Sequence, residues 1–62
     1  MRKFVFEIFH HNGNVSSRMT IAADFPKDAV EIFGEEITGM KVHAFRLFEI
    51  AENGISTQLT NW

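Results

Sequence analysis

Two Asn-Gly dipeptides, at residues 12–13 and 53–54, most constrain what this chain can fold into. Each lies between segments in which apolar and polar residues alternate. Asn-Gly is the preferred centre of a two-residue type I′ hairpin loop, because both central residues of that loop need positive φ. The tripeptide FEI precedes each dipeptide, so the two segments resemble one another beyond the turn. The sequence therefore predicts two similar β-hairpins, at residues 2–22 and 41–62.

Two-residue loops would also fix which residues lie opposite one another. In both hairpins Phe then faces Met or Leu, and Ile faces Ser or Thr. Glu7 faces Arg18, an opposite-charge pair of the kind that stabilises neighbouring strands. The expected pairs are His10–Val15, Ile8–Ser17, Glu7–Arg18, Phe6–Met19 and Phe4–Ile21 in the first hairpin, and Ile50–Thr57, Glu49–Gln58, Phe48–Leu59 and Phe45–Trp62 in the second.

Between the hairpins, residues 26–37 have the pattern of an amphipathic helix. Pro26 suits the first helical position, where an N–H is not needed, and Gly39 suits the end. Gly34 is unusual, because glycine in a helix interior costs about 1 kcal/mol relative to alanine. Close approach to the sheet and an early helix end are its two explanations. The expected core-facing stripe consists of Ala29, Val30, Phe33 and Ile37.

Together these elements predict a single domain, residues 1–62, with an α+β fold of the form ββαββ. In this fold one helix packs on one face of a four-stranded sheet. The chain is too short for two domains. Two strand orders are open: 2-1-3-4, antiparallel throughout, and an order in which the second and third strands pair in parallel. The sheet residues expected to face the helix are Phe4, Phe6, Ile8, Val15, Met19, Ile21, Val42, Ala44, Phe48, Ile50, Ile55 and Leu59.

The opposite face of the predicted sheet carries more apolar residues than a solvated face needs. An apolar patch surrounded by charge indicates an interaction site, although single exposed apolar residues are normal on any protein. Self-association is the expected use, because a two-fold dimer buries the same patch twice. The predicted interface residues are Val5, Phe9, Arg18, Phe45, Leu47 and Trp62.

A single-stranded nucleic acid is the alternative ligand for this face. Lys3, Arg18 and Lys41 are expected there beside aromatic rings, a combination suited to phosphates and stacked bases. Glu7 and Glu49 at the predicted centre of the face count against this ligand, as does the net charge of −2.

The exposed side of the predicted helix is acidic, and Lys27 is the only cation among residues 26–37. A solvated helix surface is the simplest interpretation. A docking surface for a basic partner protein is the other. The acidic residues are Asp28, Glu31, Glu35 and Glu36.

No residue pattern predicts catalysis, a metal site or a cofactor. The chain has no cysteine. His10 and His11 are adjacent in a predicted strand and therefore point to opposite faces, while His43 lies away from them. No serine has the Gly-x-Ser-x-Gly setting of a nucleophile, and no glycine-rich loop precedes the helix. We therefore expect a non-catalytic protein.

In its short length, lack of cysteine and mild acidity, the chain is similar to small phage or mobile-element proteins that bind and inhibit host machinery, anti-CRISPR proteins among them. That resemblance, one of general character, implies an inhibitor of a host nucleic-acid-binding complex. The residues themselves predict a small protein-binding module that forms a homodimer. The N-terminal segment lacks a signal-peptide cleavage site and no apolar run is long enough to span a bilayer, so we expect a cytoplasmic protein.

Overall fold

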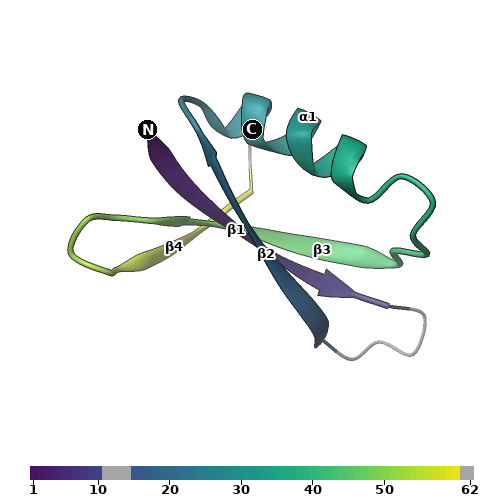
Figure 1. The fold of residues 1–62 in the computed structure, drawn as a ribbon. Coiled ribbons are helices and arrows are strands. Elements are labelled where there is room, and N and C mark those ends of the chain that lie inside the picture. The colour runs from purple at the N-terminus through teal and green to yellow at the C-terminus, as the bar shows by residue number, and fades with distance from the viewer. Residues whose placement is uncertain (11–14, 61–62) are drawn as a thin grey trace.

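The computed structural model describes residues 1–10 and 15–60, and the side chains of all of these except Val15 and Ser16. Four strands form one antiparallel sheet, and one helix packs on one side of it (Figure 1). The predicted α+β ββαββ fold is confirmed. The elements are β1 (Arg2–Phe9), β2 (Val15–Ala23), α1 (Pro26–Glu36), β3 (Ala44–Ile50) and β4 (Ser56–Leu59).

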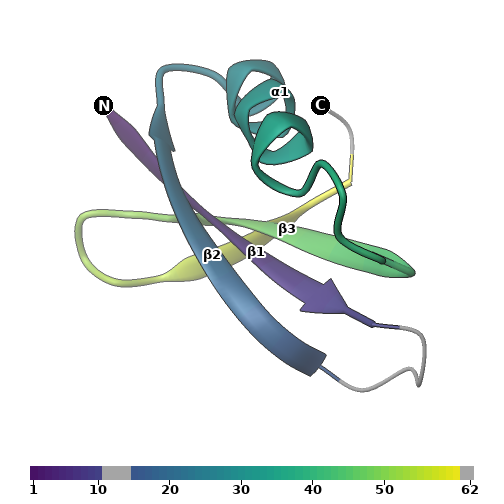
Figure 2. The ribbon, with the colours of Figure 1, turned by 45° about the vertical axis from the view of Figure 1, so that its right-hand side comes forward.

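The strand order is β2-β1-β3-β4, which places the N-terminal strand inside the sheet. This is the antiparallel one of the two orders that the sequence left open. The sheet is twisted, so the β1–β2 hairpin crosses the β3–β4 hairpin obliquely (Figure 2). The strand order makes β2 and β4 the two edge strands.

The register between β1 and β2 follows the prediction over most of its length. Phe4, Phe6, Glu7 and Ile8 have the expected partners on β2. The register then shifts by one residue, so that Val15 lies opposite Phe9 and the predicted His10–Val15 pair is wrong. The extra residue on β2 is Ser16, the position of a β-bulge. The Asn12-Gly13 turn lies outside the described residues.

The turn between β3 and β4 is not the predicted two-residue loop. Ala51 N–H donates to the carbonyl of Ile55, and Gly54 N–H donates to the carbonyl of Ala51, each at 2.9 Å. Gly54 has φ of 87°, whereas Asn53, like every other described non-glycine residue, has negative φ. This is a three-residue loop, a type I turn followed by a left-handed glycine.

The longer loop shifts the β3–β4 register by one residue, so Leu47 rather than Phe48 lies opposite Leu59. Pairing with β1 sets the orientation of β3: Leu47 lies opposite Phe6 and is fully buried. Alternate side chains point to opposite faces of a strand, so the neighbours of Leu47 point away from α1. Three residues predicted to face the helix lie instead on the other side of the sheet: Ala44, Phe48 and Ile50.

The centre of the core is a cluster of three aromatic rings. Phe6 stacks on Phe33 of α1 with ring centroids 4.1 Å apart, and Phe45 lies against both rings, at 5.6 Å and 4.8 Å. Ala29 and Phe33 are the buried residues of α1, as its apolar stripe predicts. Partly buried side chains packed around this core are Met19, Val30, Ile37, Val42, Phe45 and Leu59. Ile55, which was expected in the core, is exposed in the β3–β4 turn.

The ends of α1 agree with the expected signals, with Pro26 in its first turn and Gly39, at φ of 87°, just beyond its end. Gly34 fits neither of its two explanations. It lies inside α1, so the helix does not end there, and a Cβ added to it would meet nothing within 4 Å. In the part of the chain that the structure describes, no helix has the length and apolarity needed to cross a membrane.

Candidate functional site

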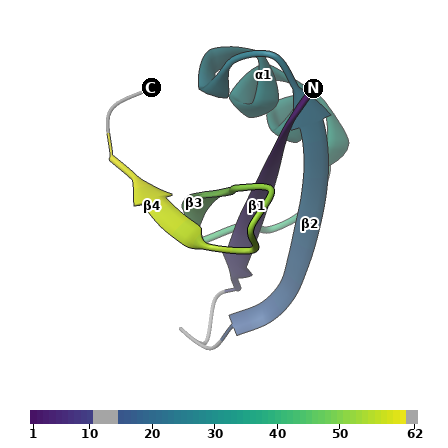
Figure 3. The same ribbon diagram turned by 90° about the vertical axis from the view of Figure 1, so that its left-hand side faces the viewer.

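We call the side of the sheet that points away from α1 the outer face. Among the described residues, α1 is the only helix and lies wholly on the opposite side, so no other element covers the outer face (Figure 3). The strand registers place these residues on it: Lys3, Val5, Glu7, Phe9, Arg18, Thr20, Ala22, Ala44, Arg46, Phe48, Ile50, Ser56 and Gln58.

The middle of the outer face is an open hollow of about 400 Å³. Val5 of β1 and Phe48 of β3 lie directly opposite one another at its centre, and Ile50 extends this apolar floor toward the end of β3. All three side chains are half-buried, so they keep some contact with solvent. The other lining residues are polar or charged: Glu7, Arg18, Thr20 and Ser56.

Cations outnumber carboxylates on this face. Glu7 lies between two arginines, with Arg18 opposite it on β2 and Arg46 opposite it on β3. The Nη2 of Arg18 lies 3.1 Å from Oε2 of Glu7, whereas the guanidinium of Arg46 lies over the ring of Phe9, 5.0 Å from its centroid. With Lys3, the outer face has three cations and one carboxylate, a net charge of 3 − 1 = +2 on a chain whose net charge is −2.

The predicted interface residues divide into three groups. Val5, Phe9 and Arg18 lie on the outer face as expected. Phe45 and Leu47 do not, because β3 presents them to the core and Leu47 is fully buried. Trp62 lies outside the described residues. Lys41, expected on the outer face, is in the loop that precedes β3. Three large side chains of this surface were missed: Arg46, Phe48 and Ile50.

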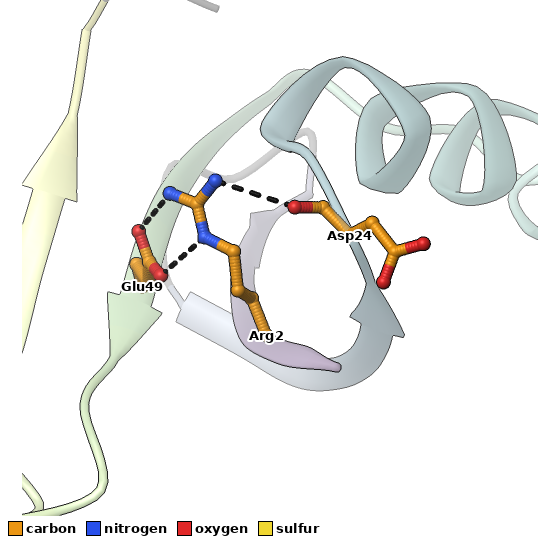
Figure 4. Close-up of polar contacts among 3 residues, drawn as sticks. All are labelled: Arg2, Asp24 and Glu49. Atoms are coloured by element: carbon orange, nitrogen blue, oxygen red, sulfur yellow. Dashed lines mark hydrogen bonds and ion pairs between the residues drawn. The ribbon is translucent and has the colours of Figure 1, made fainter.

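Glu49 lies on the helix side of the sheet, contrary to the prediction, and its partner there is Arg2. The guanidinium of Arg2 donates from Nε and Nη2 to the two carboxylate oxygens of Glu49, at 2.7 Å and 2.6 Å (Figure 4). Its Nη1 also donates to the backbone carbonyl of Asp24, at 3.3 Å. Arg2 therefore joins β1, β3 and the segment that leads into α1.

The same contact changes the acidity of both groups. The hydrogen bonds from Arg2 hold the pKa of the Glu49 carboxyl below its ordinary value, and the hydrogen bonds to Glu49 raise the pKa of Arg2. Glu49 lies on the helix side and is paired with Arg2, so its negative charge does not add to the charge of the outer face.

The acidic residues of α1 are all exposed, as expected: Asp28, Glu31, Glu35 and Glu36. The use of this surface for a basic partner stays a prediction. Among the described residues, no group of three or more histidine, aspartate or glutamate side chains is placed to hold a metal ion. His11 lies outside the described residues.

In comparisons with known proteins, no family model, no curated protein and no solved structure matches this chain.

Proposed function

We propose that the chain is a small non-catalytic binding protein whose outer face takes an acidic segment of a partner protein that carries a large apolar side chain. The observation that supports this is the open hollow between Val5, Phe48 and Ile50 on a face with three cations and one carboxylate. An apolar hollow can take an anchoring side chain, and surrounding charges of one sign select the sign of the partner.

The charge of the outer face argues for a different molecule rather than a second copy as the partner. Two outer faces placed against each other would bring together six cations and two carboxylates. Like charges that face each other at an interface cost several kcal/mol. The dimer predicted through this face therefore has an electrostatic cost that an acidic partner does not.

Single-stranded nucleic acid is the second candidate ligand. The observed orientation of β3 makes the outer face more suitable for it than the face predicted from the sequence. Glu49 is absent from the outer face, whereas Arg46 and Phe48 are present. The ring of Phe9 is already covered by the guanidinium of Arg46, so it offers less surface for stacking a base. For this reason we place the acidic protein segment first.

A random peptide-display selection against the immobilised chain tests the proposal. We expect the enriched peptides to combine Asp or Glu with one large apolar residue. Phe48→Thr should weaken a selected peptide about tenfold or more, because a central apolar anchor carries a large share of binding energy. The matched control is Phe25→Thr, since Phe25 is exposed beside α1 and remote from the outer face.

Enriched peptides without acidic residues, or binding that Phe48→Thr does not weaken, would contradict the proposal.

The second candidate is tested by fluorescence anisotropy with a labelled oligothymidylate. Binding of this oligonucleotide that requires Phe48 and falls steeply with salt would replace the protein partner by a nucleic acid. A host nucleic-acid-binding complex as the target, and a cytoplasmic location, stay predictions.

A further inference from the structure

The second surface of interest is the free edge of β2, which borders the outer face. β2 pairs with β1 on one side only, and it is the longest strand of the sheet as described, with nine residues. Proteins usually protect such an edge with lysine, proline, a bulge or a covering segment, because its unpaired N–H and C=O groups can bind another strand.

The protection on β2 is weak. The bulge at Ser16 is near the start of the strand, and from Ser17 to Ala23 the register with β1 is regular. This stretch contains no lysine or proline, and its one charged residue, Arg18, is drawn over β1 by its ion pair with Glu7. Seven consecutive residues therefore present a regular edge.

A groove of about 360 Å³ runs beside this edge, between β2 and α1. Met19 and Ile21 lie on its helix side, and Ile32 of α1 overhangs it with 38 % of its surface exposed. Ile32 is the one large apolar residue of α1 left exposed, and it lines the same groove as Met19 and Ile21. The groove thus offers apolar contacts in addition to backbone hydrogen bonds.

We propose that β2 pairs with β2 of a second copy in antiparallel orientation, so that two four-stranded sheets join into one sheet of eight strands. Two copies of this edge pair without a clash of charge when the two-fold axis passes through Thr20, so that each Thr20 lies opposite the other. Met19 then lies opposite Ile21 of the partner on the helix side, and Arg18 lies opposite Ala22 on the outer side. This register uses all seven regular residues.

An axis one residue to either side of Thr20 leaves fewer regular pairs: residues 17–21 for an axis at Met19 and residues 19–23 for an axis at Ile21. An axis at Arg18 puts two arginines directly opposite one another. In the Thr20 register the two Arg18 positions are offset by four residues, about 13 Å along the strand. That distance exceeds the Debye length of about 8 Å at physiological salt, so their repulsion is largely screened.

The test is the mass of the natural chain and three single variants by sedimentation equilibrium over a concentration series. We expect a dimer of the natural chain. Ala22→Lys should weaken it about tenfold or more, since each copy then places lysine opposite Arg18 of its partner, and like charges directly opposite destabilise strand pairs. Ala22→Glu should strengthen the dimer, because it puts a carboxylate in the same place.

Gln58→Lys is the control for added charge, because Gln58 is exposed on β4 at the other edge of the same face. It should leave the dimer unchanged. A natural chain that is monomeric at millimolar concentration would overturn the proposal. Equal effects of Ala22→Lys and Gln58→Lys would also overturn it, because the dimer would then use another surface.

An isotope-filtered NOE experiment on a mixed dimer gives a direct readout of the register. Contacts between Met19 of a labelled copy and Ile21 of an unlabelled copy are expected, and a dimer that lacks them would contradict the Thr20 register. The outcome is independent of the proposed function, because Phe48→Thr alters the outer face and should leave this dimer intact.

Discussion

Arg2, at the start of the first strand, holds Glu49, near the end of the third, with two hydrogen bonds of 2.6–2.7 Å. The pair lies on the helix side of the sheet, and its arginine also donates to the carbonyl of Asp24. A paired, hydrogen-bonded carboxylate can lie beside a core at little cost, whereas an unpaired one cannot. The contact therefore permits the orientation of β3 that leaves Arg46, Phe48 and Ile50 on the outer face.

We expect Glu49→Gln to lower the stability of the fold at neutral pH and to lose this effect in acid. The folded protein holds the pKa of Glu49 below its ordinary value. The unfolded chain therefore binds the proton more readily, and the pair stabilises the fold at pH values above the ordinary glutamate pKa of about 4.3. The contribution declines as the pH falls through the lower pKa of the folded state.

Thermal unfolding of the natural chain and the variant from neutral pH to about pH 2 would measure this dependence. The difference in Tm should shrink as the pH falls below the ordinary glutamate value. Glu52→Gln, in the exposed β3–β4 turn, is the matched control and should show a smaller difference at neutral pH. A difference for Glu49→Gln that is the same at every pH would contradict the role of the pair.

The orientation of β3 predicts unequal losses of stability at two adjacent residues. Leu47→Ala should cost about 2–5 kcal/mol, because it removes a fully buried side chain and leaves a cavity. Phe48→Ala should cost about 1 kcal/mol, because a half-buried ring loses only part of its transfer free energy. Urea unfolding of both variants measures the two costs, and a larger loss for Phe48→Ala would show that β3 faces the other way.

Gly34→Ala should stabilise the protein. Gly34 lies inside α1, and a methyl group added at its Cα would meet nothing within 4 Å, so alanine causes no clash. The gain expected for this change in an exposed helix interior is about 1 kcal/mol. Chemical denaturation at a single pH is sufficient to measure it. A loss of stability would mean that the methyl group meets a neighbour, against the packing described.

The β3–β4 loop predicts that Asn53 and Gly54 respond differently to alanine. Gly54→Ala should destabilise the fold by about 1 kcal/mol or more, because φ of 87° is unfavourable for a residue with a Cβ. Asn53→Ala should cost less, because Asn53 has negative φ and loses only the hydrogen bond from Ile55 N–H to its Oδ1, at 3.1 Å. Similar large costs at both positions would instead indicate the type I′ loop.

Local signals predicted the elements and much of the core, but they did not determine which face of β3 is buried. The turn dipeptides, Pro26 and the apolar stripe of α1 specify elements because they act within a few residues. On β3, one face carries Arg46 beside Phe48, and the other carries Glu49 beside Leu47. Each choice puts one charge on the helix side, so alternation alone cannot decide.

Two features determine the orientation and register of β3. One is a contact with a residue far away in the sequence, and the other is a loop that is one residue longer than predicted. On the helix side Arg2 neutralises Glu49, from a position 47 residues earlier in the chain. Asn-Gly also fits a three-residue loop, in which only the glycine needs positive φ. The outer face was therefore predicted in part. The residues predicted for it on β1 and β2 are correct, whereas on β3 the residues next to the predicted ones point outward.

The place of β1 inside the sheet has a consequence for how the chain folds. The β1–β2 and β3–β4 pairings are hairpins that form between near neighbours, but β1 and β3 join residues from 44 − 9 = 35 to 50 − 3 = 47 positions apart. Forming that contact requires closing a long loop, and such closures slow folding. We therefore expect the two hairpins to form before the complete sheet. Until β3 has been synthesised, the edge of β1 that pairs with β3 is free to bind a strand of another chain.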